Sequence, residues 1–361
     1  METRITSDSR LFSGVSIGEV ELENRLAVAP MTRVSATHEG LATEDMVAYY
    51  ESFARGGFGL IITEGIYPDE AHGQGYWNQP GLANDEQVES WRRVTEAVHE
   101  QGAKIFAQLM HAGALVQGNR FTEGTIGPSA VPPKGKKMEM YGGSGDFNLP
   151  EELGHEGISE VIRSFTAAAL RAREAGFDGV EIHGANGYLL DQFLTDYTNR
   201  RTDEYGGPVE NRVRLSAEVA EAVRQAVGRD FPVGMRVSQA KVNDPDHAWA
   251  GGESDAAVVF GRLSEAGLDY IHVTEPTITE PAFGDGPTLA ALARRYGGGV
   301  SVIANGSLHD PRDAESTVRE EADVAALGKS ALANMDWPNR VRDEHPLEDF
   351  DPQVLESLRR L

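Results

Sequence analysis

Short apolar runs alternate with longer amphipathic segments along the whole chain. Such runs are typical of strands that are buried on both faces of a parallel sheet. Eight of them stand out, at residues 26–29, 60–63, 104–109, 179–182, 233–237, 270–273, 300–304 and 324–327. The pattern therefore predicts eight strands.

The amphipathic segments between these runs predict helices. Several begin with Asp or Pro and end near Gly, as helices commonly do. They cover residues 45–55, 85–101, 158–175, 209–227, 255–266, 288–296 and 311–320. Alternating strands and helices indicate an α/β fold, and eight strands favour a closed (β/α)8 TIM barrel. We expect residues 1–361 to form this barrel as a single domain, since barrels of this length are common.

An open, doubly wound sheet is the alternative fold for this pattern. Its dinucleotide-binding form needs a glycine fingerprint between the first strand and helix, and the chain has none. The Gly-rich residues 142–145 follow a polar, Lys-rich segment, which indicates a loop. Residues 111–157 are rich in Gly and Pro and too long for an ordinary connection. We expect them to form a long functional loop after strand three, over the C-terminal mouth of the barrel.

Composition and charge narrow the class of partner. The 361 residues are 40% hydrophobic and 25% charged, which is enough apolar material for a large core. The net charge of −24 argues against nucleic acid and anionic membranes, which select for clustered Lys and Arg. The chain has no cysteine, which excludes disulfides and Cys-ligated metal sites. Residues 1–14 lack the apolar region of a signal peptide, so we expect a cytoplasmic protein, monomeric or homo-oligomeric, with small-molecule partners.

Candidate site residues stand where the predicted strands end. Barrel enzymes build their active sites from the C-terminal ends of the strands and the loops that follow. The residues at these positions are Pro30, Met31, Thr32, Glu64, Gly65, Gln108, His111, His183, Asn186, Tyr188, Arg236, Asn305, Gly306, Gly328 and Lys329. The last four suit a phosphate site, because glycines expose backbone N–H groups and Lys supplies a cation, but they also suit two tight turns.

Three of these residues, His183, Asn186 and Tyr188, lie close together on one segment that leaves a strand. Each alone could be a structural polar group, whereas three together favour a ligand site. A second interpretation makes His183, His111 and Glu64 metal ligands or the proton-transfer set of an isomerase or aldolase. It is less favoured, because no close His pair and no mid-barrel Lys accompanies them.

Seven blocks of sequence resemble the Old Yellow Enzyme family of FMN-dependent ene-reductases. They occur in the family's order and extend over nearly the whole chain. The blocks are LFSGVSIGEVELENRLAVAPMTR, GLIITEGIYPDEAHGQGYWNQPGLANDEQVESW, GAKIFAQLMHAG, AGFDGVEIHGANGYLLDQFLTDYTNRRTDEYGGPVENR, PVGMRVS, SVIANGSL and VAALGKSALANMDWPNRV. The resemblance implies a TIM barrel that binds FMN, takes hydride from NAD(P)H and passes it, in a ping-pong cycle, to electron-poor alkenes such as α,β-unsaturated carbonyl or nitro compounds.

The resemblance also implies a role for each matching residue. At the flavin, it assigns the ring edge to Pro30, Met31 and Thr32, a close approach over the ring to Gly65, and the pyrimidine side to Gln108 and Arg236. At the phosphate end, the matching residues are Asn305, Gly306, Gly328 and Lys329. At the substrate, His183 and Asn186 match the pair that binds the carbonyl oxygen, Tyr188 matches the proton donor, and Tyr76 matches an aromatic residue of the pocket.

Two positions depart from the family's pattern. Lys329 stands where the family usually has Arg, which replaces a bidentate fork with a point charge. Thr32 stands where one subgroup has Cys, so the chain resembles the Thr-containing branch. Two other functional classes remain open from the residues alone: a flavin-free isomerase or aldolase acting on a sugar phosphate, and a flavin-binding protein without catalytic activity.

Overall fold

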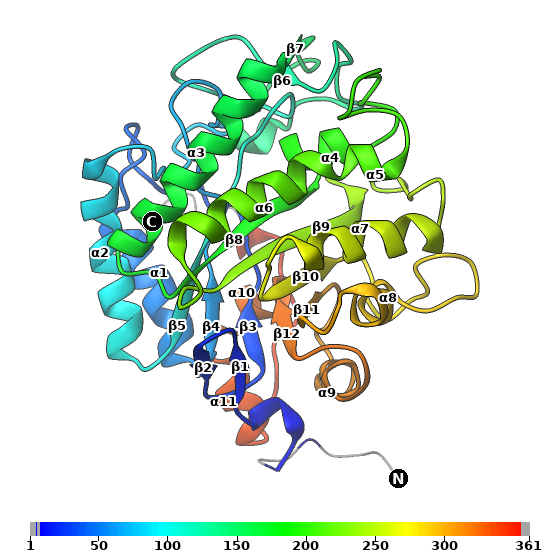
Figure 1. Ribbon diagram of the computed structural model, residues 1–361. Coiled ribbons are helices and arrows are strands. Elements are labelled where there is room, and N and C mark those ends of the chain that lie inside the picture. Colours follow the sequence, from blue (N-terminus) through cyan, green and yellow to red (C-terminus); the bar gives the residue numbers. More distant parts are fainter. Residues whose placement is uncertain (1–4, 6–7, 355–361) are drawn as a thin grey trace.

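Eight parallel strands form a closed barrel in the computed structural model, which describes residue 5 and residues 8–354 (Figure 1). Around the barrel their order is β10-β11-β12-β3-β4-β5-β8-β9. Their bounds are β3 (Leu26–Val28), β4 (Leu60–Ile62), β5 (Lys104–Leu109), β8 (Gly179–Asn186), β9 (Val233–Lys241), β10 (Tyr270–Thr274), β11 (Ser301–Asn305) and β12 (Val324–Leu327). The predicted TIM barrel is confirmed, with one strand at each predicted apolar run.

Helices surround the barrel (Figure 1). They are α1 (Glu44–Arg55), α2 (Asp85–Glu100), α3 (His155–Glu174), α4 (Leu189–Leu194), α5 (Val209–Arg212), α6 (Arg214–Val227), α7 (Glu253–Glu265), α8 (Leu289–Tyr296), α9 (Pro311–Glu320), α10 (Lys329–Ala333) and α11 (Trp337–Arg342). Every predicted helical segment is helical, although residues 209–227 form two helices, α5 and α6, that meet at Val213. The sequence pattern missed α4, α10 and α11, because five or six residues are too few to establish a helical period.

Side-chain caps explain where several of these helices begin. Thr43 accepts a hydrogen bond from the N–H of Met46 at the start of α1, and Thr288 accepts one from Ala291 at the start of α8. Asn84 does the same for α2, through the N–H of Gln87. Each cap satisfies one of the N–H groups that a helix leaves unpaired in its first turn.

A short hairpin, β1 (Val15–Ile17) and β2 (Val20–Leu22), lies at one end of the barrel (Figure 1). Ile17 and Leu22 are buried and pack with barrel residues such as Phe106 and Tyr270. The hairpin therefore closes the apolar interior against solvent. The sequence pattern did not predict it, because strands of three residues give no alternation to detect.

Residues 110–154, between β5 and α3, carry little regular structure. They contain β6 (Ile126–Gly127), which pairs in parallel with β7 (Glu151–Glu152), and a 3-10 turn η2 (Glu139–Tyr141). The sequence predicted a loop over residues 111–157, so it missed these short elements and placed the start of α3 three residues too late. The lid role stays a prediction, as does the single domain over residues 1–361, of which 1–4, 6–7 and 355–361 lie outside the described residues. Within the described part of the chain, no helix is long and apolar enough to cross a membrane.

We expect Gly234→Ala to destabilise the barrel. Gly234 lies in β9, and a Cβ at this position would sit 2.2 Å from the fully buried ring of Tyr270. Overpacking of this kind costs about 1–3 kcal/mol, which urea unfolding monitored by circular dichroism would measure. Gly124→Ala is the matched control, because its Cβ would meet its nearest neighbour at an ordinary 3.5 Å. Equal stability of the two variants would contradict this account of the interior.

Candidate active site

A cavity of about 700 Å³ opens at the C-terminal ends of β3, β11 and β12. Its lining includes seven of the residues predicted from the strand ends, namely Pro30, Met31, Thr32, Asn305, Gly306, Gly328 and Lys329. Residues 307–309, Tyr141 and residues 347–350 complete one side of it. The volume is in the range of cofactor sites. Sequence reasoning missed the contribution of residues 347–350, which follow no strand and carry no motif.

Backbone geometry explains one glycine of this cavity and leaves another unconstrained. Gly306 has φ +145°, and a Cβ there would lie 2.1 Å from the carbonyl oxygen of Glu275, so only glycine fits the turn after β11. At Gly328 the nearest atom to such a Cβ is Met31 Sδ, 3.8 Å away. Beside it, the ammonium of Lys329 lies 5.9 Å from the centre of the Phe350 ring. A cation therefore stands at the cavity edge.

Arg236 connects this cavity to the neighbouring strand ends. Its guanidinium donates to Asn305 Oδ1 at 2.7 Å, to Thr274 Oγ1 at 3.2 Å and to Asn186 Oδ1 at 3.3 Å. Burial lowers the pKa of Arg236, and the carboxylate of Glu181 opposes that shift. An arginine nevertheless stays charged in proteins. Its Nε has no hydrogen-bond partner within the described residues, so a fixed cation with a spare donor faces this region.

Two buried tyrosines contact each other where β8 ends. The hydroxyls of Tyr76 and Tyr188 are 2.5 Å apart, although the residues are 112 positions apart in sequence. Both side chains are buried, and burial raises the pKa of Tyr188 to about 12. The Tyr188 ring also packs on the ring of His183, with centroids 4.9 Å apart. Tyr188 is therefore protonated at neutral pH and placed next to an imidazole.

His183 is a neutral imidazole in this structure. It is 4% exposed, and burial together with nearby Arg236 holds its pKa well below the ordinary value. Its Nδ1 has no partner within the described residues. Asn186 follows three residues later, where β8 bulges against β9, and it adopts φ +61°. Both residues thus end β8 with polar groups that are available to a ligand.

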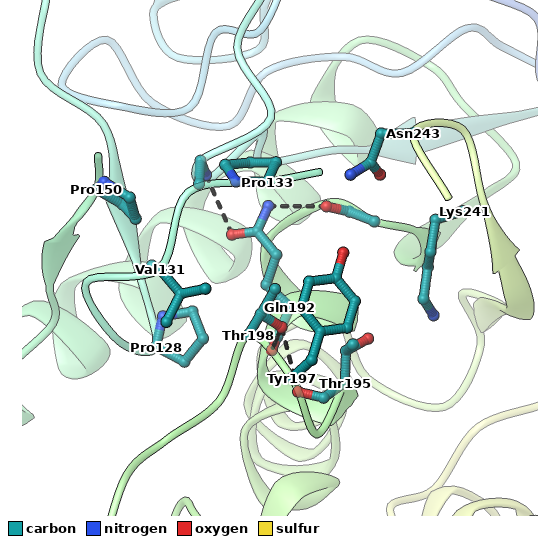
Figure 2. A pocket seen from close by; sticks show the side chains of 13 residues that line it. Pro128, Val131, Pro133, Pro150, Gln192, Thr195, Tyr197, Thr198, Lys241 and Asn243 are labelled. Carbon is teal, nitrogen blue, oxygen red and sulfur yellow. Dashed lines mark hydrogen bonds between the residues drawn. The ribbon is translucent and has the colours of Figure 1, made fainter. Parts of the chain in front are cut away.

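The turn that carries Asn186 and Tyr188 is held by side chains of α4 (Figure 2). Asp191 accepts a hydrogen bond from the N–H of Gly187 at 2.7 Å, and Gln192 donates to the Gly187 carbonyl at 2.8 Å. Asp191 also forms a fully buried ion pair with Lys241 Nζ, at 2.6 Å. These contacts fix both polar groups of the Gly187 peptide, so the turn has one geometry.

Gly65 lies against Met110, and its approach to a flavin ring stays a prediction. A Cβ at this position would lie 2.6 Å from Met110 Sδ, and Met110 packs with Tyr76 and Tyr188. The Gly65 carbonyl accepts a hydrogen bond from Gln79 Nε2 at 2.8 Å. Packing therefore requires glycine here independently of any ligand.

The sequence analysis missed three polar residues of this region: Thr274, at the end of β10, and Glu181 and His272, which lie inside strands. Thr274 binds Arg236, and Glu181 with His272 forms a buried polar pair next to Gln108. The sequence carried a signal, since Glu and His rarely occur within apolar strand runs unless they are paired. Attention to strand ends alone overlooked it.

The alternative metal or proton-transfer set does not assemble. Glu64 accepts backbone N–H groups of Arg33 and Val34, each at 2.9 Å, and burial raises its pKa. His111 accepts the N–H of Gly113 and faces Asp69 at 3.5 Å. Among the residues that the structure describes, neither Glu64 nor His111 forms a hydrogen bond or an ion pair with His183. The predicted grouping is therefore not brought together.

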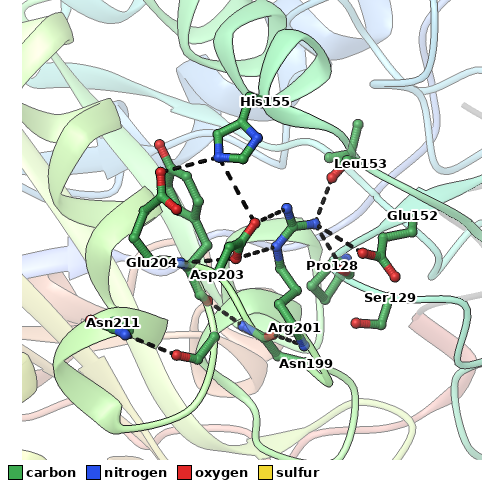
Figure 3. A network of polar contacts seen from close by, with 12 residues as sticks. Pro128, Ser129, Glu152, Leu153, His155, Asn199, Arg201, Asp203, Glu204 and Asn211 are labelled. Carbon is green, nitrogen blue, oxygen red and sulfur yellow. Dashed lines mark hydrogen bonds and ion pairs between the residues drawn. The ribbon is translucent and has the colours of Figure 1, made fainter.

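One other cluster, His155 with Asp203 and Glu204, has ligand-type atoms within 4.8 Å of one another in the described residues (Figure 3). Arg201 forms a bidentate ion pair with the Asp203 carboxylate, and it also donates a hydrogen bond to the carbonyl of Leu153. A guanidinium at this position opposes a cation. The cluster therefore joins the segment before α3 to the loop before α5.

Comparison with known proteins identifies the family. The model of the NADH:flavin oxidoreductase / NADH oxidase family matches residues 10–348. The chain belongs to this family. Two family relatives are an NADH oxidase of Thermoanaerobacter brockii, 35% identical over 94% of this chain, and the flavin oxidoreductase hxnT of Emericella nidulans, 34% identical over 94%. The chain spans about half the length of the first (52%) and 92% of the second.

The structural comparison agrees with this family membership. The solved structure of the old yellow enzyme homologue from Zymomonas mobilis superimposes with a TM-score of 0.86 at 32% sequence identity, covering 96% of both chains. The resemblance to Old Yellow Enzyme seen in the sequence is therefore confirmed, and the chain is a member of a family of FMN-dependent oxidoreductases that use NAD(P)H.

We expect the stability of the protein to fall as the pH drops below about 6.5, the ordinary pKa of histidine. Burial lowers the pKa values of His111, His183 and His272, so these side chains stay neutral in the folded protein after the unfolded chain has taken up protons. The stability they contribute is present above that pH and is lost below it. The slope is roughly 1.4 kcal/mol per pH unit for each histidine.

Urea unfolding at several pH values between about 7.5 and 5.5, with saturating FMN, measures this slope. His111→Asn is the informative variant, because an amide oxygen can replace the Nδ1 acceptor while removing the titrating group. Its slope should be shallower by about one proton. An unchanged slope would show that His111 does not contribute.

Proposed function

We propose that the chain is an ene-reductase that reduces the activated double bond of α,β-unsaturated carbonyl or nitro compounds in a ping-pong cycle. The observation that carries the proposal is the cluster at the end of β8, where protonated Tyr188 lies against neutral His183 with Asn186 beside them. When bound, FMN supplies the hydride chemistry, accepting a hydride from NAD(P)H and donating it to the acceptor's Cβ.

Orphaned buried polar atoms support a cofactor at this position. Arg236 Nε and His183 Nδ1 are both buried and without a partner within the described residues, although buried polar groups are normally paired. The Arg236 cation would face the pyrimidine side of the flavin, with Gln108, and would stabilise the negative charge of the reduced form. Pro30, Met31 and Thr32 would line the flavin edge.

The phosphate would lie at the other end of the cavity. The left-handed turn at Gly306, with Asn305 before it, and the Gly328–Lys329 pair at the start of α10 offer backbone N–H groups and one ammonium. Since Lys is a point charge, it would attract the phosphate without fixing its orientation as Arg does.

The acceptor would bind with its oxygen toward His183 and Asn186. A neutral imidazole and an amide are hydrogen-bond donors that stabilise negative charge as it develops on that oxygen, as an oxyanion hole does. Tyr188 would then give its hydroxyl proton to Cα. Tyr76, whose hydroxyl is 2.5 Å away, would line the pocket and hold the Tyr188 hydroxyl in place.

Spectroscopy of the purified protein tests the proposal. FMN bound to the protein should give visible absorbance that NADH or NADPH bleaches without air and that an enone, a maleimide or a nitroalkene restores. A colourless protein that takes up no added FMN would contradict the proposal and favour an isomerase or aldolase. Bound flavin that neither nicotinamide bleaches would indicate a flavin-binding protein without catalysis.

Tyr188→Phe should separate the two half-reactions. The hydroxyl is needed to deliver a proton to Cα and has no chemical role in flavin reduction by NAD(P)H. Loss of a general acid costs about 10²- to 10⁴-fold, so enone reduction should slow by that factor while anaerobic bleaching stays within a few-fold, as stopped-flow absorbance would measure. Nitroalkenes should be affected less, because the nitronate can be protonated in water.

Tyr205→Phe is the matched control, because its hydroxyl donates to Glu218 outside the site. It should leave both half-reactions near the parental rates. Equal slowing of the two half-reactions by Tyr188→Phe, together with lost thermal stability, would make Tyr188 a packing residue and overturn its role as proton donor.

A further inference from the structure

A chain of three polar side chains crosses the apolar interior of the barrel beneath the candidate site. Gln108 of β5 donates from Nε2 to Glu181 Oε1 at 2.8 Å, and His272 of β10 shares a 2.8 Å hydrogen bond between its Nδ1 and Glu181 Oε2. Glu181 and His272 are fully buried, and Gln108 is 2% exposed. Glu181 thus lies between two partners that come from different strands.

The carboxylate fixes the orientation of the Gln108 amide. An ionised carboxylate only accepts hydrogen bonds, so the group that faces Glu181 must be the NH2 of Gln108. The carbonyl oxygen of Gln108 is then left to accept a hydrogen bond from a ligand. Without the carboxylate the amide could turn over and present a donor instead.

Glu181 of β8 and His272 of β10 flank β9, which carries Arg236, so the carboxylate and the guanidinium attract each other across the interior although no direct ion pair joins them among the described residues. Burial acts to raise the pKa of Glu181, but His272, Arg236 and Gln108 together bring it below the ordinary value, so the carboxylate is ionised. The pKa of His272 is lowered by burial, which makes it a neutral donor from Nδ1. His272 and Arg236 are register partners on adjacent strands. This part of the interior therefore holds one cation and one anion.

Packing alone does not require this charge. A glutamine at position 181 would have the same shape and could hydrogen-bond to both neighbours, because neutral His272 can exchange its tautomer. It would also avoid the desolvation of a carboxylate, which costs several kcal/mol in a protein interior. An ionised group kept in such a position indicates a role for its charge.

We propose that Glu181 is a positioning residue of the cofactor site, which orients Gln108 and, as the counter-charge of Arg236, lowers the reduction potential of bound FMN. The inference rests on the proposed function. Reduced FMN carries additional negative charge, which Arg236 stabilises and Glu181 opposes. The two buried charges together would set how strongly the protein favours reduced over oxidised FMN.

Glu181→Gln tests the charge directly. It should increase the affinity for reduced FMN relative to oxidised FMN at least tenfold, which equals a rise of about 30 mV in the potential of the two-electron couple. The potential is measured on the FMN-loaded protein by anaerobic equilibration with a reference dye, and the dissociation constant of oxidised FMN by fluorescence. A role in packing alone would not move the potential in this direction.

Glu315→Gln is the matched control. Glu315 is another buried carboxylate, 7% exposed, but it lies on α9 outside the barrel and accepts the N–H of Leu11. The substitution removes the same charge from the chain and should change the ratio of the two FMN affinities less than twofold. An equal shift in both variants would attribute the effect to net charge and overturn the inference.

Glu181→Gln could fail to fold, because it leaves Arg236 without a counter-charge. A second pair of variants, which lack Arg236, then tests the same charge. Arg236→Met lowers the potential by removing the cation, and Arg236→Met combined with Glu181→Gln removes both buried charges. The double variant must have a higher potential than Arg236→Met alone, and equal potentials would overturn the inference. A protein that binds no FMN in any form would instead contradict the proposed function.

Discussion

A buried guanidinium organises the C-terminal end of this barrel. Removing the charge of Arg236 from water is tolerated only because its N–H groups find acceptors. Those acceptors are side chains at the ends of three other strands, β8, β10 and β11, so satisfying one cation fixes the positions of three strand ends relative to β9. The cavity and the β8 turn each share a member of this hydrogen-bonded group, namely Asn305 and Asn186.

The fold followed from the sequence because its signal is repeated and local. Each strand of the barrel coincides with a short, mainly apolar run, and Asn84 or Thr288 marks the start of a helix by a single side-chain cap. The hairpin β1–β2 and helix α4 were not predicted, because elements of three and six residues are too short for their periodic pattern to repeat. Packing against the barrel, and not local propensity, holds these short elements in place.

The site was predictable only in part, for a physical reason. Strand-end position led to Arg236, Asn186 and the cavity-lining turns at Gly306 and Gly328, because topology alone brings strand ends together. The contact between Tyr76 and Tyr188 depends on how two loops fold, which no local pattern encodes, and only the family resemblance pointed to Tyr76. Glu181 shows the opposite case: its signal was present, as a charge within an apolar run, but its partner His272 is 91 residues away.

The hydrogen bonds of Gln192 restrict how the loops of this barrel could be redesigned. Its single amide reaches the carbonyls of Ala112 and Gly187 and accepts the N–H of Ala114, so it couples the segment after β5 to the turn after β8. A change in the length or sequence of residues 110–154 would therefore shift the side chains at the end of β8. A grafted loop would therefore also change the positions of Asn186 and Tyr188, so the loop and this turn would have to be redesigned together.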